Sequence, residues 1–182
     1  MKGSRIAIQG IGGSYSDAAA EMICGAGYER LSYPDFSSTL ASVASGEAEA
    51  GVVPIRNTIT GPIEAVERLI QNMKLCRSDT ASIRVDHVLA GSPGTSVSEI
   101  RTVRSHSQAL KQCAGYLIAN PGLRALAFAD TASAVRHVVL SADASEAAIG
   151  SRRAAELYGA AILAERIADS EDNETVFCLV KR

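Results

Sequence analysis

Short segments of β-type apolar residues alternate with alanine-rich helical segments along most of the 182 residues. The first predicted strand is Arg5–Gln9, and a glycine-rich turn separates it from a predicted helix over Ala18–Cys24. The same alternation recurs several times before residue 164. Such a pattern predicts an α/β fold in which helices cover sheets of mainly parallel strands.

The other predicted elements follow in the same order. Strands are expected at 50–55 (ended by the proline at 54), 83–90, 102–104, 123–128, 147–150, 162–164 and 175–181, and helices at 37–45, 62–72, 97–100, 105–118, 130–140 and 151–158. Two such β/α groups predict two lobes of one catalytic domain, 1–182, with a ligand cleft between them. Lobe A would hold about 1–80 and 160–170, and lobe B about 83–158 with the terminal strand 175–181.

Composition excludes several classes of partner. The net charge is -2 and aromatic residues make up 4%, without a basic stripe, so we expect no nucleic acid partner. No apolar run approaches the roughly 18–20 residues of a membrane span. The N-terminal apolar stretch is too short for a signal peptide. We therefore expect a cytoplasmic protein without a membrane contact.

The four cysteines, at positions 24, 76, 113 and 178, form no CxxC pair, and no histidine stands at a ligand-like offset from any of them. The three histidines are also dispersed. We therefore predict neither a disulfide nor a metal site.

Polar loops follow several of the predicted strands. The turn from Gly10 to Ser16 joins a strand to a helix, so its free N–H groups and Ser14 favour an anion. Its spacing matches neither GxGxxG nor a Walker loop, and a small carboxylate suits it better than a nucleotide. Arg56-Asn57-Thr58 follows a buried strand, and Thr131-Ala132 starts a helix. These loops are expected to converge on the cleft.

The C-terminal stretch offers a candidate catalytic hydroxyl. Asp172-Asn173-Glu174 is a polar turn, and Thr175 stands where it passes into a strand. A side chain at such an edge is exposed to a cleft yet rigidly held. The alternative is that Thr175 is a β-former that opens an edge strand.

Taken in order, these loops resemble the catalytic domain of prephenate dehydratases over nearly the whole chain. The matching segments are Gly10-x-x-Gly13-Ser14-Tyr15-Ser16, Gly51-Val52-Val53-Pro54-Ile55 with Asn57-Thr58-x-x-Gly61, Ser105-His106-x-Gln108-Ala109-Leu110-x-Gln112-Cys113, Asp130-Thr131-Ala132, Ala147 to Gly159, and Asn173-x-Thr175-x-Phe177. Each segment alone is short, but their order and spacing make a chance match improbable.

The resemblance implies a two-lobed fold like that of type II periplasmic binding proteins. It also implies a lyase that converts prephenate, or arogenate, to an aromatic product without a cofactor. Thr175 would be catalytic and donate a proton to the departing hydroxyl. The dianionic substrate would contact Ser14, Arg56, Asn57, Thr58, Thr131, Ala132, Asn173 and Phe177, with His106 and Gln108 in support or merely orienting their loop.

Two residues depart from the family pattern. Val176 replaces the arginine of the Thr-Arg-Phe signature, and Arg56 stands where the family has glutamate. One hypothesis is a relocated charge, in which Arg56 holds the substrate carboxylate that the missing arginine would have held. The alternative is that Arg56 points to solvent.

The resemblance carries further expectations. Family members form oligomers, so a homodimer is expected. Many carry a C-terminal ACT domain, whereas this sequence ends at Arg182, so we expect no phenylalanine feedback through such a domain. Two other functions remain open: decarboxylation of prephenate without aromatisation, and non-catalytic binding of a small acid.

Overall fold

The computed structural model of the chain describes residues 3–182, which form two compact units. The first unit comprises the segment up to Ile11, Tyr15–Val85 and Asp172–Arg182. The second comprises Gly12–Ser14 and Asp86–Glu171. The chain therefore passes from one unit to the other at each of the four boundaries between these segments.

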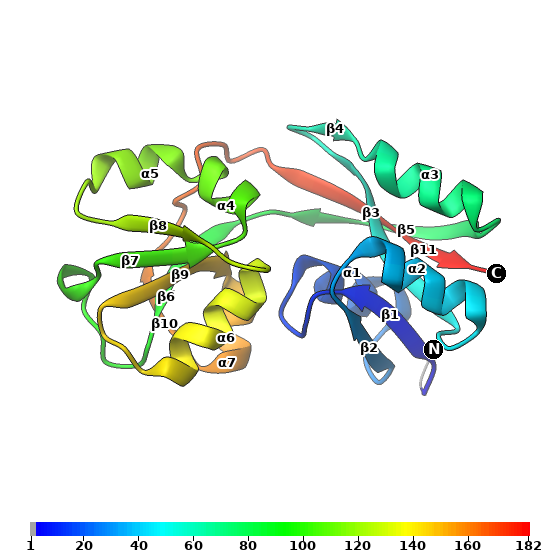
Figure 1. Cartoon of the computed structure of the whole chain (residues 1–182), viewed down its shortest axis with the longest axis horizontal. Coiled ribbons are helices and arrows are strands. Elements are labelled where there is room, and N and C mark those ends of the chain that lie inside the picture. The colour runs from blue at the N-terminus through cyan, green and yellow to red at the C-terminus, as the bar shows by residue number, and fades with distance from the viewer. Residues whose placement is uncertain (1–2) are drawn as a thin grey trace. The chain divides into compact units, whose positions relative to one another are not determined.

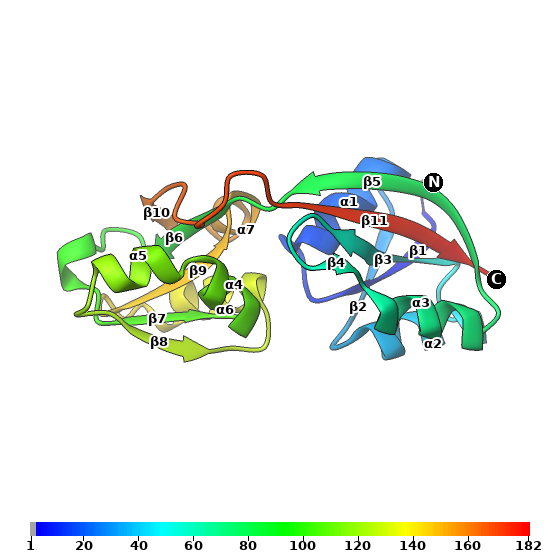
Figure 2. The same ribbon diagram turned by 90° about the horizontal axis from the view of Figure 1, so that it is seen from above.

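The first unit is built on a mixed sheet in which β11 lies between β3 and β5 (Figure 1). The sheet order is β2 (Glu29–Tyr33), β1 (Arg5–Gln9), β3 (Ala50–Asn57), β11 (Glu174–Lys181) and β5 (Cys76–Arg84), with β4 (Gly61–Pro62) paired to β3. The strands β1, β2 and β3 are parallel, whereas β11 is antiparallel to both of its neighbours. Figure 2 shows β11 and β5 side by side.

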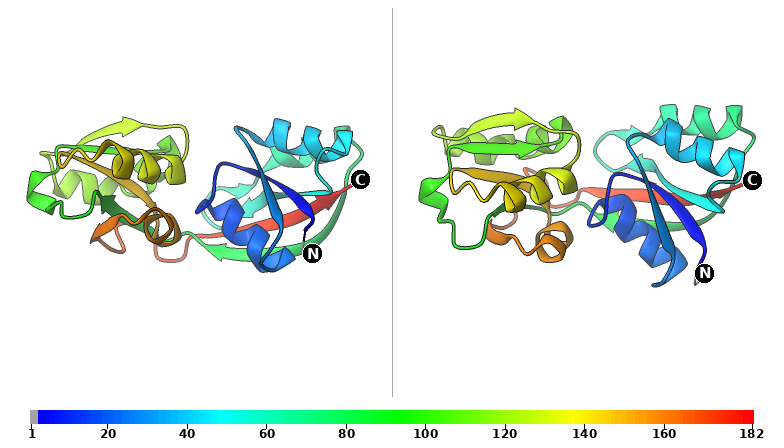
Figure 3. Two further views of the ribbon diagram at one scale, coloured as in Figure 1. Left: turned by 90° about the horizontal axis from the view of Figure 1, so that it is seen from below. Right: turned by 60° about the horizontal axis from the view of Figure 1, so that its bottom comes forward.

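Helices cover both faces of this sheet (Figure 3). Helix α1 (Tyr15–Cys24) packs on one face, in a cluster that includes Phe177 and Leu179 of β11. Helices α2 (Phe36–Ser45) and α3 (Glu64–Asn72) pack on the other face, in a cluster that includes Cys178. We call these the α1 face and the α2 face. Because β11 supplies side chains to both, it is buried on two sides.

A β-bulge interrupts the pairing of β3 with β11. Thr175 lies opposite Asn57 and Val176 opposite Arg56, but Phe177 lies opposite Pro54, so one residue of β3 is left over. Thr175 and Phe177 are two residues apart and share the α1 face. Their partners on β3, Asn57 and Pro54, are three residues apart, so strict alternation would place Asn57 on the α2 face. The extra residue of the bulge turns Asn57 to the α1 face.

Two sequence predictions about strands were wrong. Pro54 does not end β3, which continues to Asn57. The pairing of β1 with β3 ends at Val52. At Pro54, β3 therefore has no β1 residue beside it that would need an amide hydrogen, so a proline is tolerated at this position. The strand predicted at 83–90 is in fact two strands in two sheets, because the chain passes between the units after Val85.

The second unit contains a five-stranded sheet. Its order is β10 (Ala161–Ala164), β6 (His87–Gly91), β9 (Glu146–Ser151), β7 (Thr102–Ser105) and β8 (Arg124–Ala127). One face carries α4 (Ser107–Gln112) and α5 (Ala114–Ala119), and the other carries α6 (Thr131–Ser141) and α7 (Arg152–Tyr158); a short 3-10 turn, η1, covers Val97–Glu99. The single helix predicted at 105–118 is thus two helices joined at Cys113.

The units divide the chain differently from the predicted lobes. The terminal strand belongs to the first unit because β11 pairs with β3 and β5. Residues 160–170 belong to the second unit, since β10 pairs with β6. Antiparallel return strands join sheets far from their neighbours in sequence, and the alternation of strands and helices does not reveal which sheet they join.

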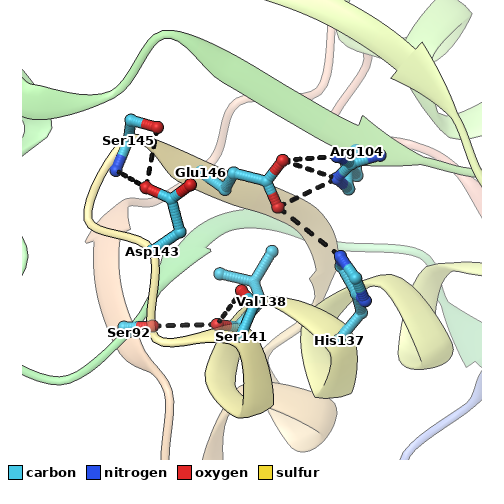
Figure 4. A network of polar contacts seen from close by, with 8 residues as sticks. All are labelled: Ser92, Arg104, His137, Val138, Ser141, Asp143, Ser145 and Glu146. Carbon is cyan, nitrogen blue, oxygen red and sulfur yellow. Dashed lines mark hydrogen bonds and ion pairs between the residues drawn. The ribbon is translucent and has the colours of Figure 1, made fainter.

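A polar network ties three elements of the second unit together (Figure 4). Arg104 of β7 donates from Nε to both carboxylate oxygens of Glu146 of β9 at 3.0 Å, and from Nη2 to Oε1. His137 of α6 approaches the same carboxylate at 3.5 Å. The hydrogen bonds from Arg104 hold the pKa of Glu146 below its usual value of 4.5.

We expect Glu146→Gln to lower the free energy of unfolding by about 1 kcal/mol at pH 7, because the pair is charge-assisted but partly exposed. A carboxyl whose pKa is lowered on folding stabilises above its unfolded pKa. The difference between wild type and variant should therefore shrink as the pH falls below 4.5. Urea unfolding at several pH values measures it, with exposed Glu156→Gln as control. A difference that stays constant down to pH 3 would contradict this account.

Candidate active site

Thr175 occupies the end of the ladder between β3 and β11. Its partner Asn57 is the last residue of β3, and Thr175 is the second residue of β11. Both side chains lie on the α1 face and are 8% exposed. Thr175, which carries the predicted catalytic hydroxyl, is therefore held by the sheet while a small part of the residue's surface stays open.

The side-chain amide of Asn57 has one possible orientation. Its Oδ1 accepts hydrogen bonds from the backbone N–H groups of Ile59 at 3.0 Å and Thr60 at 3.1 Å. Since those groups can only donate, an oxygen must face them. The Nδ2 of Asn57 consequently faces β11, where it donates to Thr175 Oγ1 at 2.8 Å and to Asn173 Oδ1 at 2.7 Å.

This arrangement gives the Thr175 hydroxyl a direction. Asn57 Nδ2 has no lone pair available, so Oγ1 of Thr175 is the acceptor in their hydrogen bond. Within the described residues, the hydroxyl hydrogen meets no acceptor of its own. Thr175 is thus arranged to donate a proton or a hydrogen bond to another molecule.

Asn173 presents a second donor without an acceptor. Its orientation follows from that of Asn57, because its Oδ1 must face the Asn57 amide hydrogens. Its Nδ2 is buried and, in the part of the chain that the structure describes, is the buried side-chain polar atom without a hydrogen-bond partner. A buried donor in this state costs about 1–3 kcal/mol, which points to a bound water or ligand oxygen as its partner.

In the second unit, the predicted anion-binding segment Gly12–Ser14 is held by contacts with Ser151 and Ala154. Ser14 is buried, and the Gly12–Ser14 segment is held by Ser151, which donates to the Gly13 carbonyl at 2.8 Å. Gly13 also lies against α7, where an added Cβ would meet Ala154 Cα at 2.8 Å. Small residues are therefore required at both positions of this contact.

The start of α6 offers less to an anion than predicted. Asp130 caps the helix, and its carboxylate accepts hydrogen bonds from the backbone N–H of Ser133 at 2.7 Å and from its hydroxyl. A negative charge therefore already faces the helix dipole near Thr131, and Ala132 is fully buried.

His106 caps α4. Its Nδ1 accepts a hydrogen bond from the backbone N–H of Gln108 at 3.2 Å, which leaves Nε2 of the exposed ring directed elsewhere. Sequence reasoning missed a nearby pair, in which buried His87 contacts Oε1 of Gln112 through Nε2 at 3.0 Å. If His87 donates, the Gln112 amide nitrogen faces away with its hydrogens available. The only signal in the sequence was the place of Gln112 in a matched motif.

Arg56 lies beside Val176 and not beside Thr175. The two are direct partners across β3 and β11. Val176 is on the α2 face, since neighbouring residues of β11 alternate between the two clusters. The side chain of Arg56 is exposed and forms no hydrogen bond or ion pair with the described residues. Phe177 is 3% exposed and packs in the α1-face cluster, so it supports the sheet.

Among the described residues, no group of three His, Cys, Asp or Glu side chains could hold a metal ion. No disulfide joins the four cysteines among the described residues, and burial raises the pKa of the Cys178 thiol to about 11. No helix in this part of the chain is long and apolar enough to cross a membrane.

Comparison with known proteins identifies relatives over the whole chain. The chain is 35% identical over 178 residues to "Arogenate dehydratase/prephenate dehydratase 1, chloroplastic" of Arabidopsis thaliana, covering 98% of this chain and 45% of the relative. It is 32% identical over 182 residues to the "Bifunctional chorismate mutase/prephenate dehydratase" of Escherichia coli, covering 98% and 47%. The chain thus spans about half the length of these relatives.

Several solved structures superpose on nearly the whole chain. A prephenate dehydratase from Arthrobacter aurescens in complex with L-Phe superposes with a TM-score of 0.87 at 28% identity, covering 98% of this chain and 60% of that one. A protein described as a novel type of quorum quenching acylase gives 0.84 at 31%, covering 98% and 64%. A putative methionine-binding lipoprotein of Bacillus subtilis, at 10% identity, covers 100% and 84% with a TM-score of 0.51, which concerns the fold alone.

The predicted two-lobed α/β fold, like that of periplasmic binding proteins, is confirmed by these structures. The family model described as "Prephenate dehydratase" matches residues 6–182. The resemblance drawn from the motifs is likewise confirmed, and the chain belongs to the prephenate dehydratase family.

Proposed function

We propose that the chain catalyses the decarboxylating dehydration of prephenate, or of its amino analogue arogenate, to the aromatic product. Family membership supports this reaction, and relatives of both names match the chain. The observation that carries the proposal is the Thr175 hydroxyl, which accepts from Asn57 at 2.8 Å and meets no acceptor for its own hydrogen within the described residues.

The chemistry needs one proton delivered at one oxygen. The bond between the ring and its carboxylate breaks, and that electron pair enters the ring as CO2 leaves. The ring becomes aromatic as the opposite carbon–oxygen bond breaks. Thr175 donates its proton to the departing hydroxide, which leaves as water, and then regains a proton from solvent. The N–H of Asn57 stabilises the negative charge that develops on Thr175 Oγ1 during the transfer.

The structurally similar quorum quenching acylase suggests a second candidate, acyl transfer with Thr175 as nucleophile. A hydroxyl nucleophile needs a base that removes its proton. The partner of Thr175 Oγ1 is an amide nitrogen that can only donate. The hydroxyl is thus poised as an acid, and we favour the dehydratase.

Other parts of the sequence-based account stay predictions. These are the substrate contacts at Ser14, Thr131, Ala132 and Asn173, a homodimer and a cytoplasmic location. Asn173 has the strongest support, because its buried Nδ2 lacks an acceptor among the described residues.

Arg56 as the replacement cation also stays a prediction. Its support is the register, because direct cross-strand partners have Cβ atoms about 5 Å apart and Arg56 faces residue 176. The long arginine side chain starts on the α2 face, one residue before the end of β3. It would therefore have to reach a carboxylate around the end of the sheet.

We expect Thr175→Val to lower kcat for prephenate by about 10² to 10⁴, the usual contribution of a positioned acid. Valine keeps the shape and β propensity of threonine but has no proton to donate. Thr175→Ser should retain more activity. Prephenate loss and phenylpyruvate gain are followed together, and exposed Thr80→Val serves as control.

The same assay separates the alternatives. Prephenate loss without phenylpyruvate would indicate decarboxylation without aromatisation. Binding of prephenate by calorimetry without any turnover would replace the dehydratase with a small-acid binder. Wild-type turnover that survives in Thr175→Val would remove the threonine from the mechanism.

We expect Arg56→Ala to raise KM roughly thirtyfold, about 2 kcal/mol, through loss of a charge-assisted contact with a carboxylate. Adding Val176→Arg to this variant should bring KM back toward the wild-type value, because the cation returns across the strand pair. Exposed Arg68→Ala is the control. An unchanged KM in Arg56→Ala would show that this side chain only faces solvent.

A further inference from the structure

Thr58 was expected to offer a hydroxyl to the substrate, but its hydroxyl forms hydrogen bonds with the main chain of residues 172 and 174. Its Oγ1 donates to the backbone carbonyl of Asp172 at 2.8 Å and accepts from the backbone N–H of Glu174 at 2.9 Å. A hydroxyl has a single hydrogen. Because that hydrogen is already bound to a carbonyl, Thr58 has no donor left for a ligand.

The main chain of Thr58 holds the same segment. Its backbone N–H donates to the Glu174 carbonyl at 2.9 Å, and Asn57 Nδ2 approaches that carbonyl at 3.2 Å. On the β5 side, the N–H of Val85 donates to the Asn173 carbonyl at 2.8 Å. The three residues before Thr175 are therefore fixed by hydrogen bonds from two directions.

The position of these bonds in the chain explains why they are needed. Asp172 is the residue at which the chain returns to the first unit, and Thr175 follows three residues later. Glu174 and Thr175 are the first two residues of β11, where a strand frays most readily. A misplacement of about 1 Å can cost about a hundredfold in rate.

We infer that Thr58 is a positioning residue, which clamps residues 172–174 and thereby holds the Thr175 hydroxyl in place without touching the substrate. The inference rests on the proposed dehydratase function for its catalytic consequence. The clamp itself is a property of the folded first unit and is testable without any substrate.

The test compares Thr58→Val with Thr58→Ser. Valine keeps the branched shape but removes the hydroxyl, whereas serine keeps the hydroxyl. We expect Thr58→Val to lower kcat for prephenate about ten- to a hundredfold with KM changed less than about threefold, and Thr58→Ser to stay near wild type. Thr80→Val, exposed in β5, is the matched control. If the valine variant does not fold, Thr58→Ala takes its place with the same expectation.

Amide hydrogen exchange without substrate provides the second measurement. The N–H of Glu174 loses its acceptor in Thr58→Val, so it should exchange at least tenfold faster, while amides in the middle of β11 keep their rates. Wild-type kcat in Thr58→Val, a rise confined to KM, or unchanged exchange at Glu174 would each overturn the clamp. A wild type that does not convert prephenate would overturn the proposed function, while faster exchange in Thr58→Val would still support the clamp.

Discussion

The side-chain amide of Asn57 is the interaction on which the candidate site depends. Its oxygen closes the turn that leaves β3, and its nitrogen bonds to Thr175 and Asn173 of the C-terminal segment. The two segments are more than 110 residues apart in sequence. The turn fixes the amide so that its nitrogen faces β11. The Thr175 oxygen therefore accepts a hydrogen bond from Asn57, and the hydrogen of the Thr175 hydroxyl remains available to donate.

Neighbouring residues of β3 and β11 have separate tasks because alternate side chains point to opposite faces. Asn57 and Thr175 meet on the α1 face, and Arg56 and Val176 meet on the α2 face. Thr58, just beyond the strand, binds the main chain of residues 172–174. Val176 therefore lies on the face of the sheet opposite to the hydrogen bonds around Thr175.

Much of the fold could be predicted from the sequence because its signals are local. Gly46 ends α2 in the left-handed conformation, Asp130 and Ser151 cap their helices, and the terminal strand follows its polar turn, so each signal lies within a few residues of the element that it begins or ends. The predictions that failed concern partners far away in sequence. The strand predicted at 83–90 was divided by the passage between units, and the terminal strand joined the first unit rather than the second.

The sequence by itself determined the family and the two-lobed α/β class, and it predicted Thr175, Asn57 and Asn173 as candidate site residues, because motif order and strand–helix alternation are local features of the chain. Only the tertiary structure decided which partners each of these side chains contacts. The bulge in β3 turned Asn57 toward Thr175, and the return of β11 engaged both sides of the Thr58 hydroxyl. These outcomes depend on the bulge in the pairing of β3 with β11 and on hydrogen bonds between segments more than 110 residues apart in sequence, which form only when the chain folds.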